Sequence, residues 1–257
     1  MKSSSLLERI QGKYQRTVSR HLFKQPLKMR NDAPIISFTF DDFPRSALLT
    51  GGEILVRHGV TGTYYASLGL MGKEAPTGFI FLPEDLKPLL EQGHELGCHT
   101  FAHCHSWDTS PQLFEQSILD NQRKLDQMHP GVTFKTFSYP ITCPRPFTKL
   151  RVSRHFACSR FGGQTFNVGT VDLNLVSAYF LEKDGGDTGA VKRMIEESCR
   201  ERGWLVIATH DVADQHSPYG CTPAFFEDVV KFAVNSGAKV VPVVQALELI
   251  GADISPN

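Results

Sequence analysis

Several features that mark membrane-spanning, secreted or disulfide-stabilised proteins are missing from this sequence. No run of about 18 apolar residues occurs, so no transmembrane helix is expected. The six cysteines form no C-x-x-C pair and are scattered over 257 residues, which argues against a disulfide framework and a structural zinc site. Residues 1–20 lack the apolar core of a signal peptide, which predicts a cytoplasmic protein.

An excess of charge of one sign is also missing. Lys and Arg together number 27, as do Asp and Glu, so the formal net charge is zero and no broad basic field indicates a nucleic-acid partner. Repeats, long linkers and low-complexity tracts are absent as well. With 41% hydrophobic residues, a chain of this length can bury a large core in one domain, which we place at residues 33–257.

Residues 6–27 predict a basic amphipathic helix within an N-terminal extension, residues 1–32. Apolar residues recur there at nearly helical spacing: Leu6, Ile10, Tyr14, Val18 and Leu22. Seven Arg and Lys residues lie along the same stretch and extend to Arg30. The apolar stripe could pack on the domain. The alternative is peripheral contact with anionic lipid at the inner membrane face, which would bring a lipid-linked substrate close.

Beyond the extension, seven or eight short β-type segments alternate with helical ones. The expected strands are residues 35–40, 59–66, 94–98, 133–139, 155–159, 173–179, 204–209 and 239–242. The expected helices are residues 46–58, 82–93, 111–127, 145–154, 188–201 and 223–236. This alternation favours a parallel sheet closed into an α/β barrel, in which functional residues gather at the C-terminal ends of the strands.

Two adjacent carboxylates, Asp41 and Asp42, follow the first strand. Alone, such a pair is typical of a solvated loop or a helix cap. Titratable residues at the ends of other strands, however, would converge on the same rim of the barrel. This convergence favours a functional role for both acids.

His99 and His103 follow the strand at residues 94–98. On a helical turn, a spacing of four would place both imidazoles on one face, where they could bind one metal ion. Two His and one carboxylate leave a coordination position open, as in catalytic zinc sites. A capping or core histidine pair is the ordinary alternative, and the competing ligands are His105, Cys104 and Asp108.

Three further residues belong to the same rim. Pro140 follows a strand and fixes a turn that leaves the N–H of Ile141 free for a ligand oxygen, although strands often end in proline. Arg160, at the end of residues 155–159, could pair with Asp41 or simply face solvent. His210 follows the apolar strand 204–209 and could act as a general acid or cap the core.

These motifs together resemble the polysaccharide deacetylase family, which is carbohydrate esterase family 4 and contains the NodB-type homology domain. The resemblance covers about residues 35–244. It is carried by T-F-D-D ending at Asp42, H-T-x-x-H from His99 to His103, S-Y-P ending at Pro140, and T-H-D around His210. It implies a distorted (β/α)7 barrel, similar to a TIM barrel, and metal-dependent removal of N-acetyl groups from amino sugars.

Carried over position by position, the resemblance implies a role for each motif residue. Asp41 would be the general base and His210 the general acid. The loop at Pro140–Ile141 would stabilise the oxyanion. The metal ligands would be Asp42, His99 and His103.

The sequence departs from the family pattern at three places. Ser138 occupies the position where an arginine is frequent, and Arg160 is the candidate replacement. Ile141 stands where an aromatic residue is usual. The acid that orients the catalytic histidine has no clear counterpart, Asp172 being a weak candidate.

We therefore expect a hydrolase of carbon–nitrogen bonds in linear amides. Its cofactor would be Zn²⁺, with Co²⁺, Ni²⁺ or Mn²⁺ as alternatives. Its substrate would be an N-acetylated amino sugar, nucleotide-linked, lipid-linked or within an oligosaccharide, used in surface polysaccharide biosynthesis such as that of O-antigen or capsule. A hydrolase of another amide or cyclic imide, and a non-catalytic carbohydrate-binding protein, are the alternatives.

Overall fold

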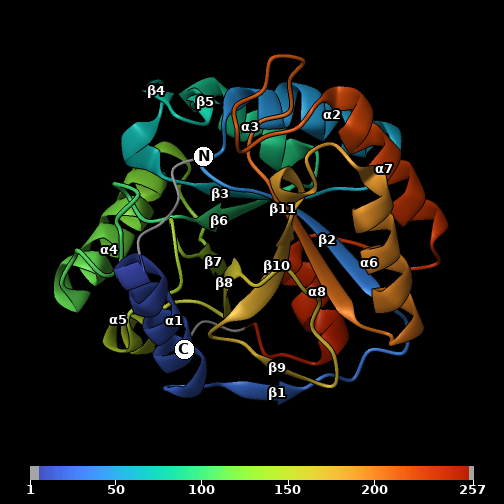
Figure 1. The fold of residues 1–257 in the computed structure, drawn as a ribbon. Helices are drawn as coiled ribbons and strands as arrows, with labels where there is room; N and C mark the ends of the chain where they lie inside the picture. Colours follow the sequence, from blue (N-terminus) through green and yellow to red (C-terminus); the bar gives the residue numbers. More distant parts are fainter. Residues whose placement is uncertain (1–5, 255–257) are drawn as a thin grey trace.

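A closed barrel of seven parallel strands forms the centre of the molecule (Figure 1). The computed structural model describes residues 6–254, with side chains from residue 10 onward. The strands follow the ring in chain order, and the last one pairs back with the first: β2 (Ile35–Phe40), β3 (Thr63–Ala66), β6 (Glu95–Cys98), β7 (Thr136–Ser138), β8 (Cys158–Gly162), β10 (Val176–Phe180) and β11 (Trp204–Thr209). The predicted (β/α)7 barrel is confirmed.

Helices surround the barrel and connect its strands, as the alternation predicted. They include η1 (Ala47–Gly52), a π-helical segment continuous with α2 (Glu53–Arg57), then α3 (Pro83–Glu91), α4 (Pro111–Met128), α5 (Pro146–Val152), α6 (Thr188–Arg200) and α7 (Pro223–Asn235). The 3-10 turns η2 (Leu68–Leu70) and η3 (Leu181–Asp184) follow β3 and β10. Four of these helices begin with proline, which is favourable at a first helical position because its missing N–H would have no partner there.

The alternation of β2 shows how the sequence reaches both sides of the barrel wall. Phe38 packs on Phe226 of α7, with ring centroids 5.6 Å apart, so this face of the strand meets the outer helices. The opposite face points into the barrel, where the Ser37 hydroxyl accepts a hydrogen bond from Trp204 Nε1 at 3.1 Å. Because side chains alternate along a strand, the Asp41 side chain points into the barrel as Ser37 does, and Asp42 lies at the rim.

The bottom of the barrel is closed by α8 (Val243–Ile250), a helix that was not predicted from the sequence pattern. Its apolar residues pack with interior residues such as Trp204 and Val206. A short strand, β12 (Lys239–Val240), precedes this helix and pairs with β2 beside the ring. Functional chemistry is thereby confined to the opposite, open end.

The predicted strand at 155–159 lies three residues too early. Residues 153–155 form a turn after α5, in which the His155 N–H donates to the Val152 carbonyl, so β8 begins only at Cys158. Arg160 consequently lies inside this strand, not after it. Two short antiparallel pairs were also not predicted: β4 (Glu74–Ala75) with β5 (Gly78–Phe79), and β1 (Pro26–Lys28) with β9 (Thr170–Asp172).

The N-terminal helix α1 (Leu6–His21) is shorter than the predicted segment of residues 6–27. Phe23 has a left-handed φ of 51°, and Pro26 starts β1, so the helix cannot continue. The prediction that the apolar stripe of this helix packs on the domain is wrong for two of its residues. Ile10 and Tyr14 are 57% and 61% exposed. Among the described residues, no helix has both the length and the apolar character needed to cross a membrane.

Candidate active site

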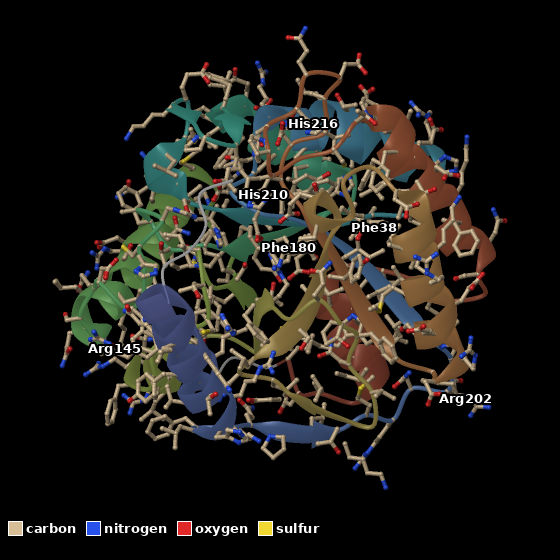
Figure 2. All side chains as sticks on the ribbon, in the orientation of Figure 1. Phe38, Arg145, Phe180, Arg202, His210 and His216 are labelled. Carbon is tan, nitrogen blue, oxygen red and sulfur yellow. The ribbon has the colours of Figure 1, made fainter. Side chains whose placement is uncertain are left out.

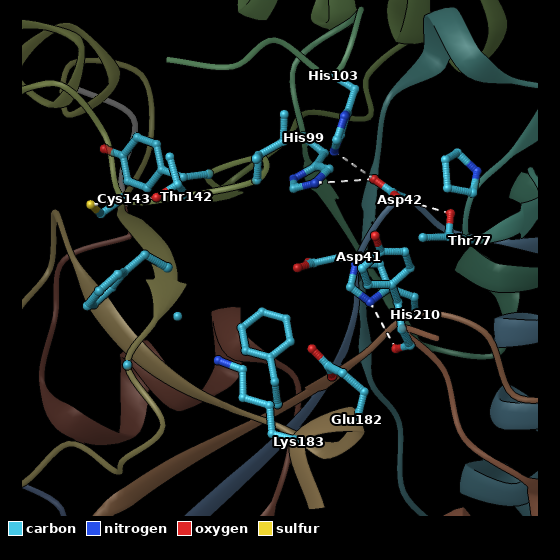
Figure 3. A pocket seen from close by; sticks show the side chains of 18 of the residues that line it. Asp41, Asp42, Thr77, His99, His103, Thr142, Cys143, Glu182, Lys183 and His210 are labelled. Atoms are coloured by element: carbon cyan, nitrogen blue, oxygen red, sulfur yellow. Dashed lines mark hydrogen bonds and ion pairs between the residues drawn. The ribbon is translucent and has the colours of Figure 1, made fainter. Parts of the chain in front are cut away.

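A cavity of about 740 Å³ opens at the C-terminal ends of the barrel strands (Figure 3). It is lined by six of the seven predicted site residues: Asp41, Asp42, His99, His103, Ile141 and His210. Figure 2 shows His210 and Phe180 close to one another near the centre of the barrel, at the ends of β11 and β10. The seventh predicted residue, Arg160, lies directly beneath the cavity and contacts Asp41.

Asp42, His99 and His103 form a compact cluster on one side of the cavity. Asp42 Oδ1 lies 3.1 Å from His103 Nε2 and 3.5 Å from His99 Nε2. One ligand atom from each residue lies within 4.8 Å of the others. The second carboxylate oxygen, Oδ2, accepts a hydrogen bond from the Thr77 hydroxyl at 3.1 Å, which holds the carboxylate in this orientation.

The orientation of His99 is fixed from behind. Its Nδ1 lies 2.8 Å from the Ser138 carbonyl oxygen, which can only accept, so Nδ1 bears the proton and Nε2 faces the cluster with its lone pair. The expected helical turn between the two histidines is wrong. The chain is a loop there, and left-handed backbone at Thr100 (φ 61°) and His103 (φ 51°) returns the second ring to the first.

The electrostatics of the cluster keep the aspartate ionised. Burial alone favours a neutral acid, but the adjacent imidazoles of His103 and His99 outweigh it and lower the pKa of Asp42 far below its usual range. Burial likewise opposes protonation of His103, yet the negative charge of Asp42 beside it raises the pKa of this ring. Each group thus stabilises the charged form of the other.

This donor set fits a divalent metal ion. Asp42 Oδ1 is buried without a hydrogen-bond partner, and the two imidazole nitrogens converge on it. Two His and one carboxylate are a ligand set of catalytic zinc and related sites. His105, one of the competing ligands, is instead paired with Asp108 at 2.6 Å and does not line the cavity.

Asp41 and Arg160 form a buried ion pair at the top of the barrel interior. Their side chains are 7% and 1% exposed, and the Arg160 guanidinium also lies over the Tyr65 ring, 4.9 Å from its centroid. Burial would raise the pKa of Asp41, but the charge of Arg160 overrides it and lowers that pKa. Gly97 makes room for this arrangement, because a Cβ there would lie 2.5 Å from the Tyr65 ring.

Ile141 lines the cavity in the turn that follows β7 (Thr136–Ser138). The residue has a left-handed φ of 69°, and the next N–H, that of Thr142, donates to the Pro140 carbonyl at 2.7 Å. Across the described residues, no protein group accepts a hydrogen bond from the Ile141 N–H. This donor is therefore available to a ligand oxygen.

His210 is oriented by a loop and not by the expected acid. Its Nδ1 lies 3.2 Å from the Tyr219 carbonyl, which leaves Nε2 for the cavity. Asp211 shapes this loop by accepting hydrogen bonds from the Ser217 N–H and hydroxyl, each at 2.6 Å. Asp172 is not the orienting residue, because its carboxylate accepts from Lys149 at 2.7 Å on another part of the molecule.

Unfavourable backbone conformations gather at this site. Eight described non-glycine residues have positive φ, and four of them line the cavity: Asp42, His103, Ile141 and Gln164. Such conformations cost about 1–3 kcal/mol each and persist where the surrounding structure imposes them, which is frequent at functional sites.

Sequence reasoning missed several residues of the cavity: Arg16, Arg20, Thr77, Glu182 and Lys183. Arg16 and Arg20 belong to α1, whose positive charge was noticed but not assigned to the site. Thr77 sits in the segment between β4 and β5, where the sequence carries no recognisable motif. Burial raises the pKa of Glu182 to about 7, so this acid also differs from a surface carboxylate.

Comparison with known proteins agrees with this geometry. Residues 28–149 match the family model described as polysaccharide deacetylase. A peptidoglycan-N-acetylglucosamine deacetylase of Listeria monocytogenes is 33% identical over 113 residues, which are 44% of this chain and 21% of that protein. The chain thus aligns with about a fifth of the length of this relative.

Solved structures share the fold. A carbohydrate esterase domain of a xylanase from the hindgut metagenome of Trinervitermes trinervoides has a TM-score of 0.62 at 17% identity, covering 88% of this chain and 94% of that one. A family 4 acetyl xylan esterase from Clostridium thermocellum, in complex with cobalt, has a TM-score of 0.60 at 19% identity, covering 86% and 94%. The resemblance inferred from the motifs is confirmed for residues 28–149.

Proposed function

We propose that this chain, which matches the polysaccharide deacetylase family model over residues 28–149, is a metal-dependent N-deacetylase of an N-acetylated amino sugar. The observation that carries the proposal is the convergence of Asp42, His99 and His103 in a cavity that also holds the paired carboxylate of Asp41 and a third imidazole, that of His210. A divalent cation held there, Zn²⁺ in our proposal, would supply Lewis-acid polarisation of a carbonyl oxygen and of water.

Asp41 acts as the general base. Arg160 keeps its carboxylate ionised, so it can accept a proton from the attacking water at neutral pH. The hydroxide forms a bond to the acetamide carbonyl carbon, and the carbonyl electron pair moves to oxygen. The ion pair also holds Asp41 in one position, which favours an oriented attack.

Ile141 acts on the oxygen of the amide, and His210 acts on its nitrogen. The Ile141 N–H donates to the developing oxyanion, a contact worth about 3 kcal/mol in comparable sites. Protonated His210 donates from Nε2 to the departing nitrogen as the carbon–nitrogen bond breaks. The products are acetate and a free amino sugar, which balances the water consumed.

We place the reaction in surface polysaccharide assembly, on a nucleotide-linked or lipid-linked sugar at the cytoplasmic side of the membrane. The basic helix α1, with Ile10 and Tyr14 exposed, supports peripheral contact with anionic lipid. Sedimentation with anionic and neutral vesicles tests this part. Equal recovery of the protein with both vesicle types, and unchanged membrane association after removal of residues 1–30, would count against it.

The decisive experiment measures metal content by elemental analysis together with acetate release from N-acetylated sugars, before and after chelation. About one metal per chain and chelator-sensitive acetate release are expected. Elemental analysis of protein purified without added metal also tests the assignment of zinc.

Other outcomes lead to different conclusions. Metal without acetate release from any sugar would favour a hydrolase of another amide or cyclic imide, which a panel of small amides would identify. Failure to bind metal under any loading condition would overturn the proposed site and leave a non-catalytic carbohydrate-binding protein as the alternative.

A further inference from the structure

Two arginines from the N-terminal helix line the same cavity as the metal cluster. Arg16 and Arg20 are four residues apart on α1, so both project from one face of the helix. Cys143 lines the same cavity as both arginines. Burial raises the pKa of its thiol, and the charges of Arg16 and Arg20 oppose this rise. Cys143 and Asp42 occupy opposite sides of the cavity in Figure 3. Both arginines therefore belong to the part of the cavity that lies away from the metal cluster.

The position of α1 is fixed by a buried lysine. Lys149 of α5 is fully buried, and its ammonium donates to the carbonyls of Ser19 and Leu22, both at 3.1 Å. It also pairs with Asp172 at 2.7 Å, which ties the C-terminal end of α1 to β9. A cation at this end of a helix is favourable because the carbonyls there are otherwise unpaired.

The arginines carry charge that the protein does not neutralise. Among residues 10–254, neither Arg16 nor Arg20 forms an ion pair, and the same holds for Lys183, which lines the cavity from η3. Arg20 lies over the Phe161 ring at 5.8 Å and Lys183 over the Phe180 ring at 5.6 Å, and both rings also line the cavity. Three cations therefore remain available to a ligand.

Two of the three acids that line the cavity already have basic partners. Asp41 is paired with Arg160, and Asp42 with the two histidines. Glu182 is the remaining cavity carboxylate, and burial raises its pKa to about 7, which reduces its negative charge at neutral pH. The side of the cavity away from the metal cluster therefore carries net positive charge.

We propose that Arg16, Arg20 and Lys183 bind a phosphate or diphosphate attached to the amino sugar. This inference rests on the proposed deacetylase function and names the chemical class of its substrate. Guanidinium groups bind phosphate oxygens in pairs, and a diphosphate supplies enough negative charge for three cations, which a single carboxylate does not. A nucleoside diphosphate sugar and a polyprenyl diphosphate sugar share this chemistry.

Steady-state kinetics of the metal-loaded protein test the proposal. Acetate release is measured from uridine diphosphate N-acetylglucosamine and from neutral chitotriose. Each of Arg16→Gln and Arg20→Gln is expected to raise KM for the diphosphate substrate about tenfold, with kcat nearly unchanged. Neither variant should change KM for chitotriose, and Arg→Lys at each position should restore part of the affinity. Arg200→Gln, an exposed arginine on α6 outside the cavity, is the matched control.

Salt gives a second, independent signature. In the wild type, KM for the diphosphate substrate should rise between 50 and 300 mM NaCl more steeply than KM for chitotriose. The Arg16→Gln/Arg20→Gln double variant should lose this difference. Equal salt dependence for both substrates in the wild type would contradict an anionic subsite.

Binding of uridine diphosphate, measured by calorimetry with and without chelator, tests the subsite without turnover. Weaker binding of uridine diphosphate by the arginine variants supports the proposal even if the protein releases no acetate. The absence of acetate release would then count against the proposed function alone. The phosphate subsite would be overturned if acetate were released with equal KM values for both substrates and the variants bound uridine diphosphate as the wild type does. The proposed deacetylase function would still hold. Comparing a short polyprenyl diphosphate with uridine diphosphate as competitors identifies the source of the phosphate.

Discussion

The two sides of the cavity are built in different ways. Asp42, His99 and His103 are held on short loops that directly follow barrel strands, and hydrogen bonds from Thr77 and to Ser138 fix their orientation. Arg16 and Arg20 instead belong to a helix that precedes the barrel and is attached by tertiary contacts. We call the first the rigid side, in which Asp42 and His99 are buried and His103 is partly buried. We call the second the basic side, in which Arg16 and Arg20 are exposed.

This difference assigns separate roles. A rigid, preorganised side suits bond breaking, because small displacements there are costly. Long exposed side chains suit recognition of a charged group that varies in position. Substitutions on the first side should therefore change metal binding and kcat, and those on the second should change KM.

The largest effect is expected from His99→Ala. Loss of one of three ligands should weaken metal binding by more than the roughly 100-fold cost known for residues that only support ligands, and acetate release should fall to the chelated background. His105→Ala is the matched control, because His105 pairs with Asp108 outside the cavity. Metal content after dialysis and acetate release are measured for both variants. A His99→Ala protein with full metal content would refute this ligand set.

Asp41→Asn is expected to separate chemistry from metal binding on the same side. Loss of a general base typically lowers kcat by about 10²–10⁴-fold, while the metal should stay bound because Asp41 is not a member of the ligand cluster. Elemental analysis and kcat are the measurements. A metal-free Asp41→Asn protein would show that the assigned roles of the two aspartates are wrong.

Arg160→Gln should affect stability as well as activity. Removal of one partner leaves the Asp41 carboxylate buried without its counter-charge, which costs about 3–5 kcal/mol in comparable pairs. The same substitution in an Asp41→Asn background should cost about 2 kcal/mol less, because the charge to be compensated is gone. Urea unfolding of the four proteins gives this coupling free energy. Additive effects would mean that the ion pair contributes little.

The rigid side could be predicted from sequence because each of its residues follows a strand. Parallel strands bring their C-terminal ends to one edge, so the positions of Asp42, His99 and His210 already imply that they meet. The prediction was wrong in local detail: the histidines lie on a left-handed loop, and Arg160 lies within β8. Both errors concern turn conformation, which depends on packing partners that sequence patterns do not reveal.

The basic side could not be predicted because long-range contacts position it. The charges of α1 are visible in the sequence, but their direction depends on Lys149, more than 120 residues away, which binds carbonyls at the end of the helix. α8 was missed for a related reason. Its apolar residues pack against the bottom of the barrel, so they give no sign in the sequence of which face they cover.

Thr77→Val tests how the metal ligand Asp42 is held on the rigid side. The substitution keeps the shape but removes the hydroxyl that donates to Asp42 Oδ2, so the carboxylate should be less firmly oriented. Metal affinity is expected to fall about tenfold, the lower end of the range for such supporting residues. Competition with a metal-binding dye measures the affinity, and Thr77→Ser should restore it. Unchanged affinity in Thr77→Val would show that the orientation of Asp42 does not depend on this hydrogen bond.

The smallest expected effect is a pH dependence that involves the basic side. Burial raises the pKa of Glu182 to about 7, so this acid is mostly neutral at pH 6 and mostly ionised at pH 8. Its negative charge beside Lys183 should then weaken binding of a diphosphate substrate, and KM should rise about threefold over this interval. Glu182→Gln stays neutral and should give a flat profile. A nucleotide sugar is the suitable substrate because its diphosphate keeps one charge state between pH 6 and 8. An equal rise of KM in Glu182→Gln would assign the pH dependence to another group and remove Glu182 from the recognition of the phosphate.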